Sequence, residues 1–170
     1  MNECSYKLME SLIGKYCPQY INVLDVGSYD VLQARKQKGF GCYRPIFIKG
    51  TYTGLDVVTG PNVDKVITDH YHWDIPDEAY DLIISGQCLE HIEAFWLTAK
   101  EMERVCKGWI IVIVPWKWRI HPYPVDCWRL LPDGLKFLFG KWCNFDIKEC
   151  DLACETGVLE GLCYVVGQKH

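Results

Sequence analysis

Short apolar runs alternate along the chain with longer stretches whose apolar residues have helical spacing. Five runs predict strands, at residues 20–26, 52–57, 64–68, 80–85 and 109–114. The run YDLIIS at 80–85 is nearly all apolar, which indicates a strand buried on both faces, and WIIVIV at 109–114 is the most hydrophobic of the five. Two more strands are expected at 145–152 and 161–166. The short link between them, which contains Gly157, favours antiparallel pairing.

The segments between the strands carry the helical patterns. Residues 89–106 predict one helix, because a broad apolar stripe contains Leu89, Ile92, Trp96, Ala99, Met102 and Val105. Pro132 suits the first turn of another helix, PDGLKFLFGKW. Residues 1–19 form a predicted N-terminal helical segment. After the first strand, LQARKQKGFG predicts only two helical turns, because Pro45 prevents the next segment, CYRPIFIKG, from continuing the helix. Strands that alternate with helices predict a mostly parallel sheet covered on both faces, in the α/β class.

Length and charge narrow the possible functions. The chain has 170 residues, the size of one domain with a single core. Its net charge of −4 does not fit a general nucleic-acid binder, which carries a basic excess. The apolar run 109–114 is too short to cross a bilayer, and the N-terminal residues lack the apolar core of a signal peptide. We therefore expect a cytoplasmic protein with reduced cysteines and neither a nucleic-acid nor a membrane partner.

Polar residues and a glycine gather at the carboxyl ends of the predicted strands, the edge where a parallel sheet binds its ligands. These residues are Asp25, Gly27 and Ser28 at the end of the first strand, Asp56 at the end of the second, Asp69 at the end of the third, and Ser85 and Gln87 at the end of the fourth. Taken singly, each has a structural interpretation as a turn or cap residue. Together they favour a binding site.

The residue types at this edge indicate a nucleoside ligand. A carboxylate at the end of the second strand can accept hydrogen bonds from both ribose hydroxyls, and one at the end of the third can accept a hydrogen bond from the adenine amine. Gly27 lets the backbone approach a ligand closely. The loop VGSYD lacks the three glycines of a pyrophosphate-binding turn and carries the acid Asp30. It therefore suits a nucleoside without phosphates, such as S-adenosylmethionine.

The motifs VLDVGSYD, YTGLDV, YDLIISGQCLEHIE and WIIVIVPW, in this order, resemble the class I, Rossmann-like S-adenosylmethionine-dependent methyltransferases. LEHI is most similar to the methyltransferase type 11 branch. The resemblance covers residues 20–166 and implies one domain over 1–170. The implied fold is a three-layer sandwich with a mostly parallel seven-stranded sheet and a C-terminal antiparallel hairpin.

The resemblance also implies roles for individual residues. Asp25 and Gly27 correspond to the motif that contacts the methionine part of the cofactor, Asp56 to the ribose-binding acid, and Asp69 with the His70 amide to the adenine site. The full implied cofactor set is Asp25, Gly27, Ser28, Tyr29, Asp56, Val57, Asp69, His70, Ser85 and Gln87. The sequence departs from the family at Tyr29 and Val31, where further glycines are usual, and at VCKGW, which replaces a Lys-Pro-Gly-Gly turn.

The segment after the fifth strand is a candidate acceptor pocket, because aromatic walls and a few polar groups lie between prolines. Its candidate substrate-binding residues are Trp116, Tyr123, Asp126, Trp128 and Arg129. The alternative is a surface loop with a local Asp126–Arg129 ion pair. His91 and His121 are candidate catalytic bases, because imidazole titrates near neutrality. His70 and His72 could suggest a metal, but Asp69 beside them is assigned to adenine, and we expect no metal site.

The sequence predicts a methyltransferase that acts on a small-molecule acceptor. Two alternatives remain at this point: an NAD-dependent oxidoreductase, which Asp56 would also suit, and a non-catalytic module that keeps the fold as a binding scaffold. The sequence predicts neither the acceptor nor an oligomeric state.

Overall fold

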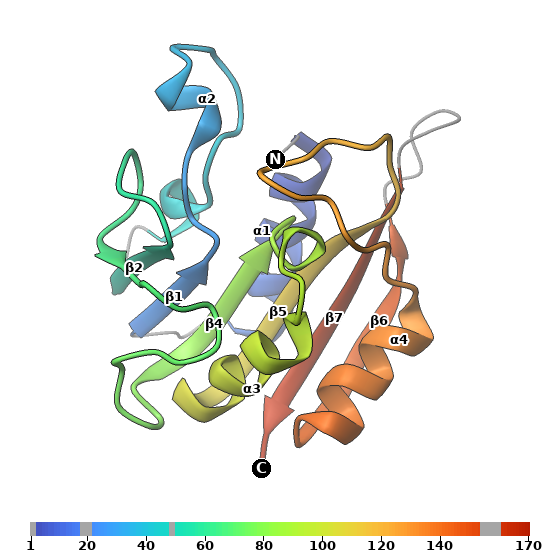
Figure 1. The fold of residues 1–170 in the computed structure, drawn as a ribbon. Helices are drawn as coiled ribbons and strands as arrows, with labels where there is room; N and C mark the ends of the chain where they lie inside the picture. Colours follow the sequence, from blue (N-terminus) through green and yellow to red (C-terminus); the bar gives the residue numbers. More distant parts are fainter. Residues whose placement is uncertain (1–2, 18–21, 48–49, 154–160) are drawn as a thin grey trace.

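The computed structural model describes residues 3–17, 22–47, 50–153 and 161–170. Within these ranges, one seven-stranded sheet has the order β3-β2-β1-β4-β5-β7-β6 (Figure 1). The strands are β1 (Asn22–Val26), β2 (Thr51–Asp56), β3 (Lys65–Val66), β4 (Tyr80–Gly86), β5 (Cys106–Lys117), β6 (Phe145–Ala153) and β7 (Gly161–Lys169). β1 to β5 are parallel, whereas β7 lies between β5 and β6 and is antiparallel to both. The predicted fold class is confirmed.

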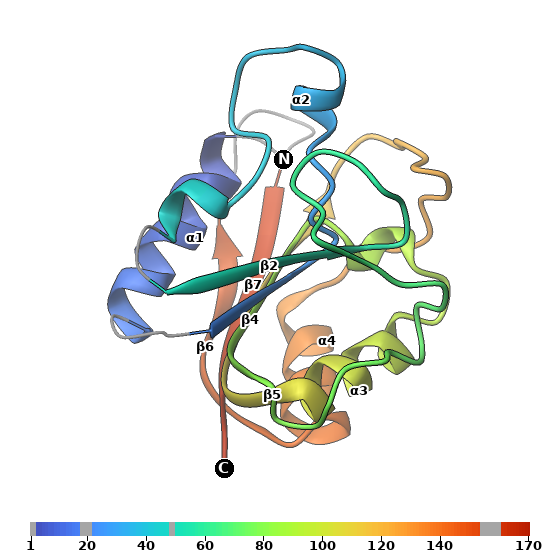
Figure 2. The ribbon, with the colours of Figure 1, turned by 90° about the vertical axis from the view of Figure 1, so that its left-hand side faces the viewer.

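Helices cover both faces of the sheet (Figure 2). On one face lies α1 (Glu3–Tyr16), which buries Met9, Leu12 and Ile13 against alternate residues of the central strands. The other face carries α3 (Phe95–Val105) and α4 (Pro132–Phe137), which continues as the π-helical turn η3 (Leu138–Trp142). Strands β4 and β5 are buried between the two layers, because residues 82–84 of β4 are at most 1% exposed and residues 110–114 of β5 are 0% exposed. This burial explains their continuous apolar pattern.

The helix predicted for residues 89–106 is interrupted. A 3₁₀ turn, η2 (Leu89–His91), comes first, and α3 begins only at Phe95. Ile92 between them has extended backbone, and its carbonyl accepts a hydrogen bond from the Trp128 indole instead of a helical amide. Leu89 and Ile92 still face the core, which is why the apolar stripe resembled one helix.

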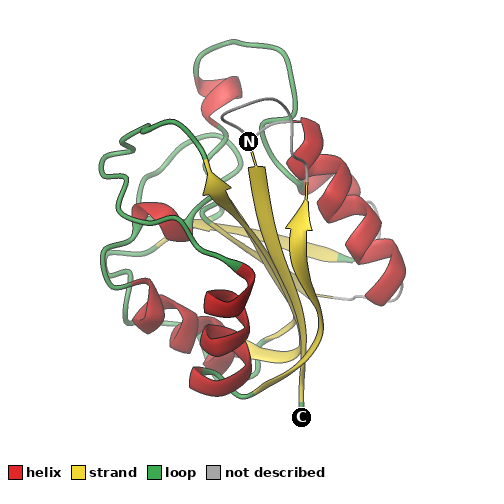
Figure 3. Ribbon diagram, turned by 90° about the vertical axis from the view of Figure 1, so that its right-hand side faces the viewer, coloured by secondary structure: helices red, strands yellow, loops and turns green. Residues whose placement is uncertain are grey.

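The first crossover helix is shorter than predicted. α2 (Val31–Ala34) has a single turn, and Asp30 caps it by accepting a hydrogen bond from the Gln33 amide. The chain leaves the helix at Lys36, whose φ is +56°. Pro45 lies in a further 3₁₀ turn, η1 (Arg44–Ile46). Figure 3 shows α2 projecting beyond the sheet, and none of its residues is buried.

Three other expectations concern segments and cysteines. The link at residues 155–157 and the start of the first predicted strand, at 20–21, lie outside the described residues. The expectation that every cysteine is a reduced thiol is wrong for Cys4, which is disulfide-bonded. In the described ranges, no helix has the length and apolar character needed to cross a bilayer.

Candidate functional site

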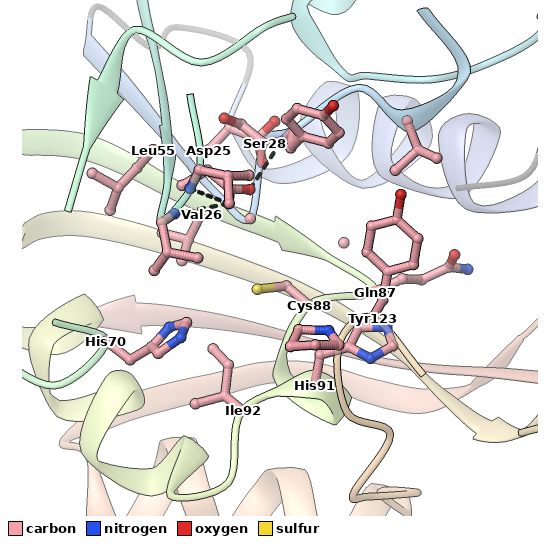
Figure 4. Close-up of a pocket in the computed structure, with 18 of the residues that line it drawn as sticks. Asp25, Val26, Ser28, Leu55, His70, Gln87, Cys88, His91, Ile92 and Tyr123 are labelled. Carbon is pink, nitrogen blue, oxygen red and sulfur yellow. Dashed lines mark hydrogen bonds between the residues drawn. The ribbon is translucent and has the colours of Figure 1, made fainter. Parts of the chain in front are cut away.

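A cavity of about 1070 Å³ lies beyond the carboxyl ends of the parallel strands. Segments following all five strands β1 to β5 line it. Figure 4 shows Asp25 and Ser28 on one side, His70 and His91 on the opposite side, and Gln87 with Tyr123 toward one end. The cavity is therefore at the sheet edge where the sequence placed the site.

The end of β1 contributes a buried carboxyl group. Asp25 is 2% exposed, and the Tyr52 hydroxyl donates a hydrogen bond to it. Asn62 in turn donates to the Tyr52 hydroxyl over 3.0 Å. Burial raises the pKa of Asp25 to about 7, although the Tyr52 hydrogen bond opposes that change. Asp25 therefore exchanges its proton near neutrality.

Gly27 and Ser28 follow Asp25 at the turn that opens the cavity. The amides of both donate to the Leu55 carbonyl, which ties this turn to the end of β2. Asp30, by contrast, does not line the cavity: its carboxylate is 7% exposed and caps α2. The sequence argued against a pyrophosphate ligand partly because of Asp30. Since the Asp30 carboxylate lies outside the cavity, it does not support that argument.

The carboxylate of Asp56, at the end of β2, holds two loops in place. Its Oδ2 accepts a hydrogen bond from the Tyr29 amide over 3.0 Å, and its Oδ1 accepts one from the Val57 amide over 2.8 Å. Oδ1 also accepts a hydrogen bond from the Val58 amide over 3.3 Å, whereas Oδ2 keeps a second lone pair that can accept a hydrogen bond from a ligand. Tyr29, Asp56 and Val57 all line the cavity.

The loop after β4 carries Gln87, which has a φ of +58°. Its backbone amide donates to the Ile113 carbonyl over 2.8 Å, which fixes the residue, while its side-chain Nε2 is buried without a hydrogen-bond partner among the described residues. An unpaired buried donor that lines a cavity is a candidate ligand contact. Ser85 has a different place: it is fully buried and its hydroxyl donates to the Val26 carbonyl over 2.8 Å.

The loop after β3 places one of its two predicted adenine residues at the cavity. His70 lines it, and its carbonyl accepts hydrogen bonds from the Trp73 indole and the Thr98 hydroxyl. Asp69 is exposed, lies outside the lining, and accepts a bond from the Tyr71 amide. The exposed Asp69 carboxylate thus stabilises a turn, as the structural alternative proposed.

His91 and His121, from η2 and from the loop after β5, meet at the far end of the cavity. Their ring centroids lie 4.9 Å apart, and the Tyr123 ring lies 6.5 Å from that of His91. His91 Nδ1 contacts the Val125 carbonyl at 2.6 Å, so this nitrogen carries the proton and Nε2 keeps its lone pair. Burial lowers the pKa of His91, which favours the neutral imidazole.

Four of the five predicted substrate-binding residues do not line the cavity. Asp126 and Arg129 form the two-pronged ion pair of the alternative interpretation, with contacts of 2.5 and 2.8 Å. The Trp128 indole donates to the carbonyls of Ile92 and Glu93, and Trp116 packs on Gly161 at the rim of the core. Only Tyr123 of this set reaches the cavity. The other four shape the loop and its support.

Several lining residues escaped the sequence analysis. Trp118, Pro122, Arg35, Cys42 and Cys88 all line the cavity. The first two belong to the loop that the sequence selected. Arg35 and Cys42 come from the irregular segment after β1, where no periodicity showed which side chains turn inward.

Glu90 also escaped the sequence analysis. It is 1% exposed, and burial raises its pKa to about 8. Neither carboxyl oxygen has a hydrogen-bond partner among the described residues. Its place in LEHI, beside a candidate catalytic histidine, was the available signal.

Comparisons with known proteins relate the chain to methyltransferases. Residues 43–112, which include β2 to β4 and much of β5, match the family model described as a methyltransferase domain. The fold is similar to that of a SAM-dependent methyltransferase from Aquifex aeolicus, at 15% identity and a TM-score of 0.65 over 95% of this chain and 89% of that one. Residues 43–112 thus carry the pattern of a methyltransferase domain, and the chain has the fold of the class I S-adenosylmethionine-dependent methyltransferases. Its cofactor is S-adenosylmethionine.

Other solved structures show the range of proteins that share the methyltransferase fold. One is a Burkholderia thailandensis 1,6-didemethyltoxoflavin-N1-methyltransferase with bound 1,6-didemethyltoxoflavin and S-adenosylhomocysteine (11% identity, TM-score 0.70, 99% of this chain and 79% of that one). Another is the putative methyltransferase in a complex with the Haloferax volcanii Trm112 activator (14% identity, TM-score 0.66, 98% and 89%). Among curated proteins, nothing matches the chain. At these identities the structural neighbours establish the fold and not the acceptor.

The cavity of the methyltransferase fits its cofactor. The Asp56 carboxylate can accept hydrogen bonds from hydroxyl groups, and the unpaired Gln87 Nε2 can donate a hydrogen bond. The Asp25 carboxyl group provides negative charge when it ionises. Bound S-adenosylmethionine carries a positive sulfonium and an ammonium group, which such a charge attracts. The donor set is therefore appropriate to the group.

Proposed function

We propose that this methyltransferase transfers the methyl group of S-adenosylmethionine to a small-molecule acceptor. The observation that carries the proposal is the two-ended cavity, with a polar end at β1 and β2 and a histidine-containing end under the loop after β5. A volume of about 1070 Å³ is at the upper end of the range for ligand pockets, which leaves room for an acceptor beside a nucleoside.

We assign the donor end to the residues after β1, β2 and β4. Asp56 would accept the ribose hydroxyls, and Asp25, Gly27 and Ser28 would face the methionine part together with Gln87. The His70 segment would border the adenine. Asp69 and Ser85 stay outside the proposed contact set, because neither lines the cavity.

At the acceptor end, we assign binding to Tyr123 and proton handling to His91 and His121. Bound S-adenosylmethionine supplies an electrophilic methyl group, and the protein's task is to align a nucleophile with it, which can contribute about 7–11 kcal/mol. The His91 Nε2 lone pair is free to accept a proton from a hydroxyl, amine or thiol. Trp118 and Tyr123 would provide the apolar walls.

The nature of the partner follows from charge and from the shape of the site. A net charge of −4 supports a small acceptor over a polynucleotide. The loop after β5 borders the acceptor end, which suits a molecule small enough to enter the cavity. We also propose a cytoplasmic location, supported by eight free cysteines in the described part of the chain; the Cys4 disulfide is the observation that opposes it.

Binding and transfer can be tested separately. Calorimetric titration of the full chain should show S-adenosylhomocysteine bound much more tightly than NADH. A radiolabelled methyl donor is then offered with small hydroxyl, amine and thiol compounds, and in parallel with total RNA and with protein extract. Label in a small compound supports the proposal. Cofactor binding without transfer to any small compound would favour the scaffold alternative, and label only in RNA or protein would overturn the small-molecule acceptor.

A further inference from the structure

Glu90, His91 and His121 converge at the acceptor end of the cavity. One potential ligand atom from each lies within 4.8 Å of the others. Glu90 Oε1 and His91 Nε2 are 3.7 Å apart, and the side chains of the three residues are 1%, 15% and 35% exposed in chain order. Ligand atoms around a first-row cation stand about 3–4 Å apart, given metal–ligand distances of about 2.0–2.2 Å. A closure of about an ångström would therefore complete the cluster.

Both imidazoles are oriented as in metal sites. His91 donates its Nδ1 proton to the Val125 carbonyl at 2.6 Å. His121 Nδ1 faces two acceptors, the Arg119 carbonyl at 3.0 Å and the Asp126 carboxylate at 3.2 Å, so it also carries a proton. With Nδ1 donating in both rings, Nε2 of each is the nitrogen left to bind a cation. Metal-binding histidines are held in this way, with the second nitrogen donating to a carbonyl or carboxylate.

The Glu90 carboxyl group is the second, independent observation. It is 1% exposed, and in the described part of the chain neither oxygen meets a hydrogen-bond donor. A buried polar group without a partner costs free energy and calls for an explanation, of which an ion is one. Glu90 Oε1 lies 3.7 Å from His91 Nε2, an acceptor. A proton on the carboxyl group or a cation between the two atoms would satisfy this pair, and only the cation would also engage His121.

The backbone and an ion pair hold the three residues in place. The Glu90 carbonyl accepts hydrogen bonds from the amides of Cys127 and Trp128, which lie on the same loop as His121. The Asp126 carboxylate is 2% exposed and accepts from the His121 backbone amide at 2.7 Å as well as from Arg129. The loop that carries His121 is thus fastened to the turn that carries Glu90.

We propose that Glu90, His91 and His121 form a binding site for a divalent transition-metal cation. Two imidazoles and one carboxylate favour Zn²⁺, Mn²⁺, Fe²⁺ or Co²⁺ over Mg²⁺ and Ca²⁺, which prefer oxygen ligands. His91 and His121 line the cavity and Glu90 lies behind them, so the open coordination positions face the acceptor end. This departs from the sequence expectation of no metal site.

The site deepens the proposed function and rests on it for its role. A cation at this position would bind an oxygen of the acceptor and lower its pKa, in place of an imidazole base. The acceptor class would then be an oxygen compound, such as an alcohol or a phenol. Metal binding itself does not depend on methyl transfer, so the two proposals can fail separately.

Titration of the metal-free full chain with Co²⁺ tests the site, because visible absorption reports the ligands directly. We expect one Co²⁺ to bind per chain. Zn²⁺ should displace it, and the same concentration of Mg²⁺ should not. Glu90→Gln, which keeps the side-chain shape, and His121→Ala should each weaken Co²⁺ binding at least tenfold. Glu10→Gln and His72→Ala, the matching changes at exposed positions outside both the cluster and the cavity, should leave it unchanged.

Thermal unfolding with and without Zn²⁺ guards against misfolded variants. Zn²⁺ should raise the Tm of the wild type and of both control variants, and should leave the Tm of folded Glu90→Gln unchanged. No Co²⁺ binding by the wild type at millimolar concentration, or equal binding by wild type and Glu90→Gln, would overturn the site. A parallel titration with S-adenosylhomocysteine separates failure of the metal site from failure of the cofactor site.

Discussion

The side chain of Cys88 lies directly against Gly27, so that a β-carbon added to Gly27 would stand 2.4 Å from the Cys88 Sγ and 2.5 Å from its Cβ. This contact joins the turn after β1 to the loop after β4, two segments that line the cavity. Gly27 also has a φ of +80°. The single glycine of VGSYD is thus required by the packing of the protein itself as well as by access for a ligand.

Gly27→Ala should destabilise the protein by about 2 kcal/mol or more, since it combines a left-handed backbone with a steric overlap. Urea unfolding measures the loss. S-adenosylhomocysteine affinity should fall as well, because the turn borders the cavity.

A Cys88→Gly change in the Gly27→Ala background should restore part of that stability. Cys88→Ala should restore less, because the alanine keeps the β-carbon that overlaps. If the two changes have additive effects on the free energy of unfolding, the contact between them is not the cause.

Asp56→Asn should weaken S-adenosylhomocysteine binding by about 10- to 100-fold, because hydrogen bonds to a charged group contribute about 1.5–3 kcal/mol. Calorimetry measures the affinity. The asparagine keeps one acceptor for the Val57 amide, so the loss of stability should be smaller than the loss of binding. Asp74→Asn, at an exposed position outside the cavity, is the matched control. Equal affinities for Asp56→Asn and wild type would remove Asp56 from the ribose site.

Asp25 should make stability depend on pH near neutrality. Its folded-state pKa of about 7 lies above the ordinary value of 3.8, so its contribution to stability is complete below about pH 4 and is lost as the pH rises through 7. Tyr52 and Asp56 face the carboxyl group, as does the more distant Arg44 charge. Between pH 5 and 8 the wild type should lose roughly 3 kcal/mol relative to Asp25→Asn, which cannot ionise.

Urea unfolding at pH 5, 6.5 and 8 measures the difference between the wild type and Asp25→Asn. Parallel pH profiles for the two proteins would show that Asp25 does not titrate in this range. Because ionised Asp25 favours a cationic ligand, S-adenosylmethionine affinity should rise over the same interval in the wild type only.

Arg129→Lys should loosen the loop after β5. Lysine cannot reproduce the two-pronged contact with Asp126, and it cannot reach the carbonyls of Trp118 and Arg119 together. Arg129→Ala would remove the arginine partner of the buried Asp126 carboxylate. The free energy of unfolding should fall by about 2 kcal/mol. This is less than for a fully buried pair, because the Arg129 side chain is 25% exposed.

The double variant Asp126→Asn with Arg129→Ala separates charge from packing. It should be more stable than Arg129→Ala alone, since it removes the unpaired charge. Equal stabilities of the double and the single variant would show that Arg129 acts through packing.

The sheet was predictable because the hydrophobic pattern of each strand is visible in its own residues. β4 and β5 are apolar on both faces, and the acids and glycine at the strand ends had to meet at one edge of a parallel sheet. Asp25, Gly27, Asp56 and Gln87 were found in this way. The interrupted helix at Ile92 was not predictable, because the interruption depends on a hydrogen bond from Trp128, a residue 36 positions away.

By itself, the sequence determined the fold class and the sheet edge at which the cavity lies, because strand hydrophobicity and the residues at strand ends are local properties. Only the tertiary structure decided which side chains of the loop after β5 face the cavity. It turned Asp126, Arg129 and Trp128 toward the protein and brought His121 to Glu90 and His91. Such placements arise from contacts between segments that are distant in the sequence. The periodicity of hydrophobic residues along the chain does not predict these contacts.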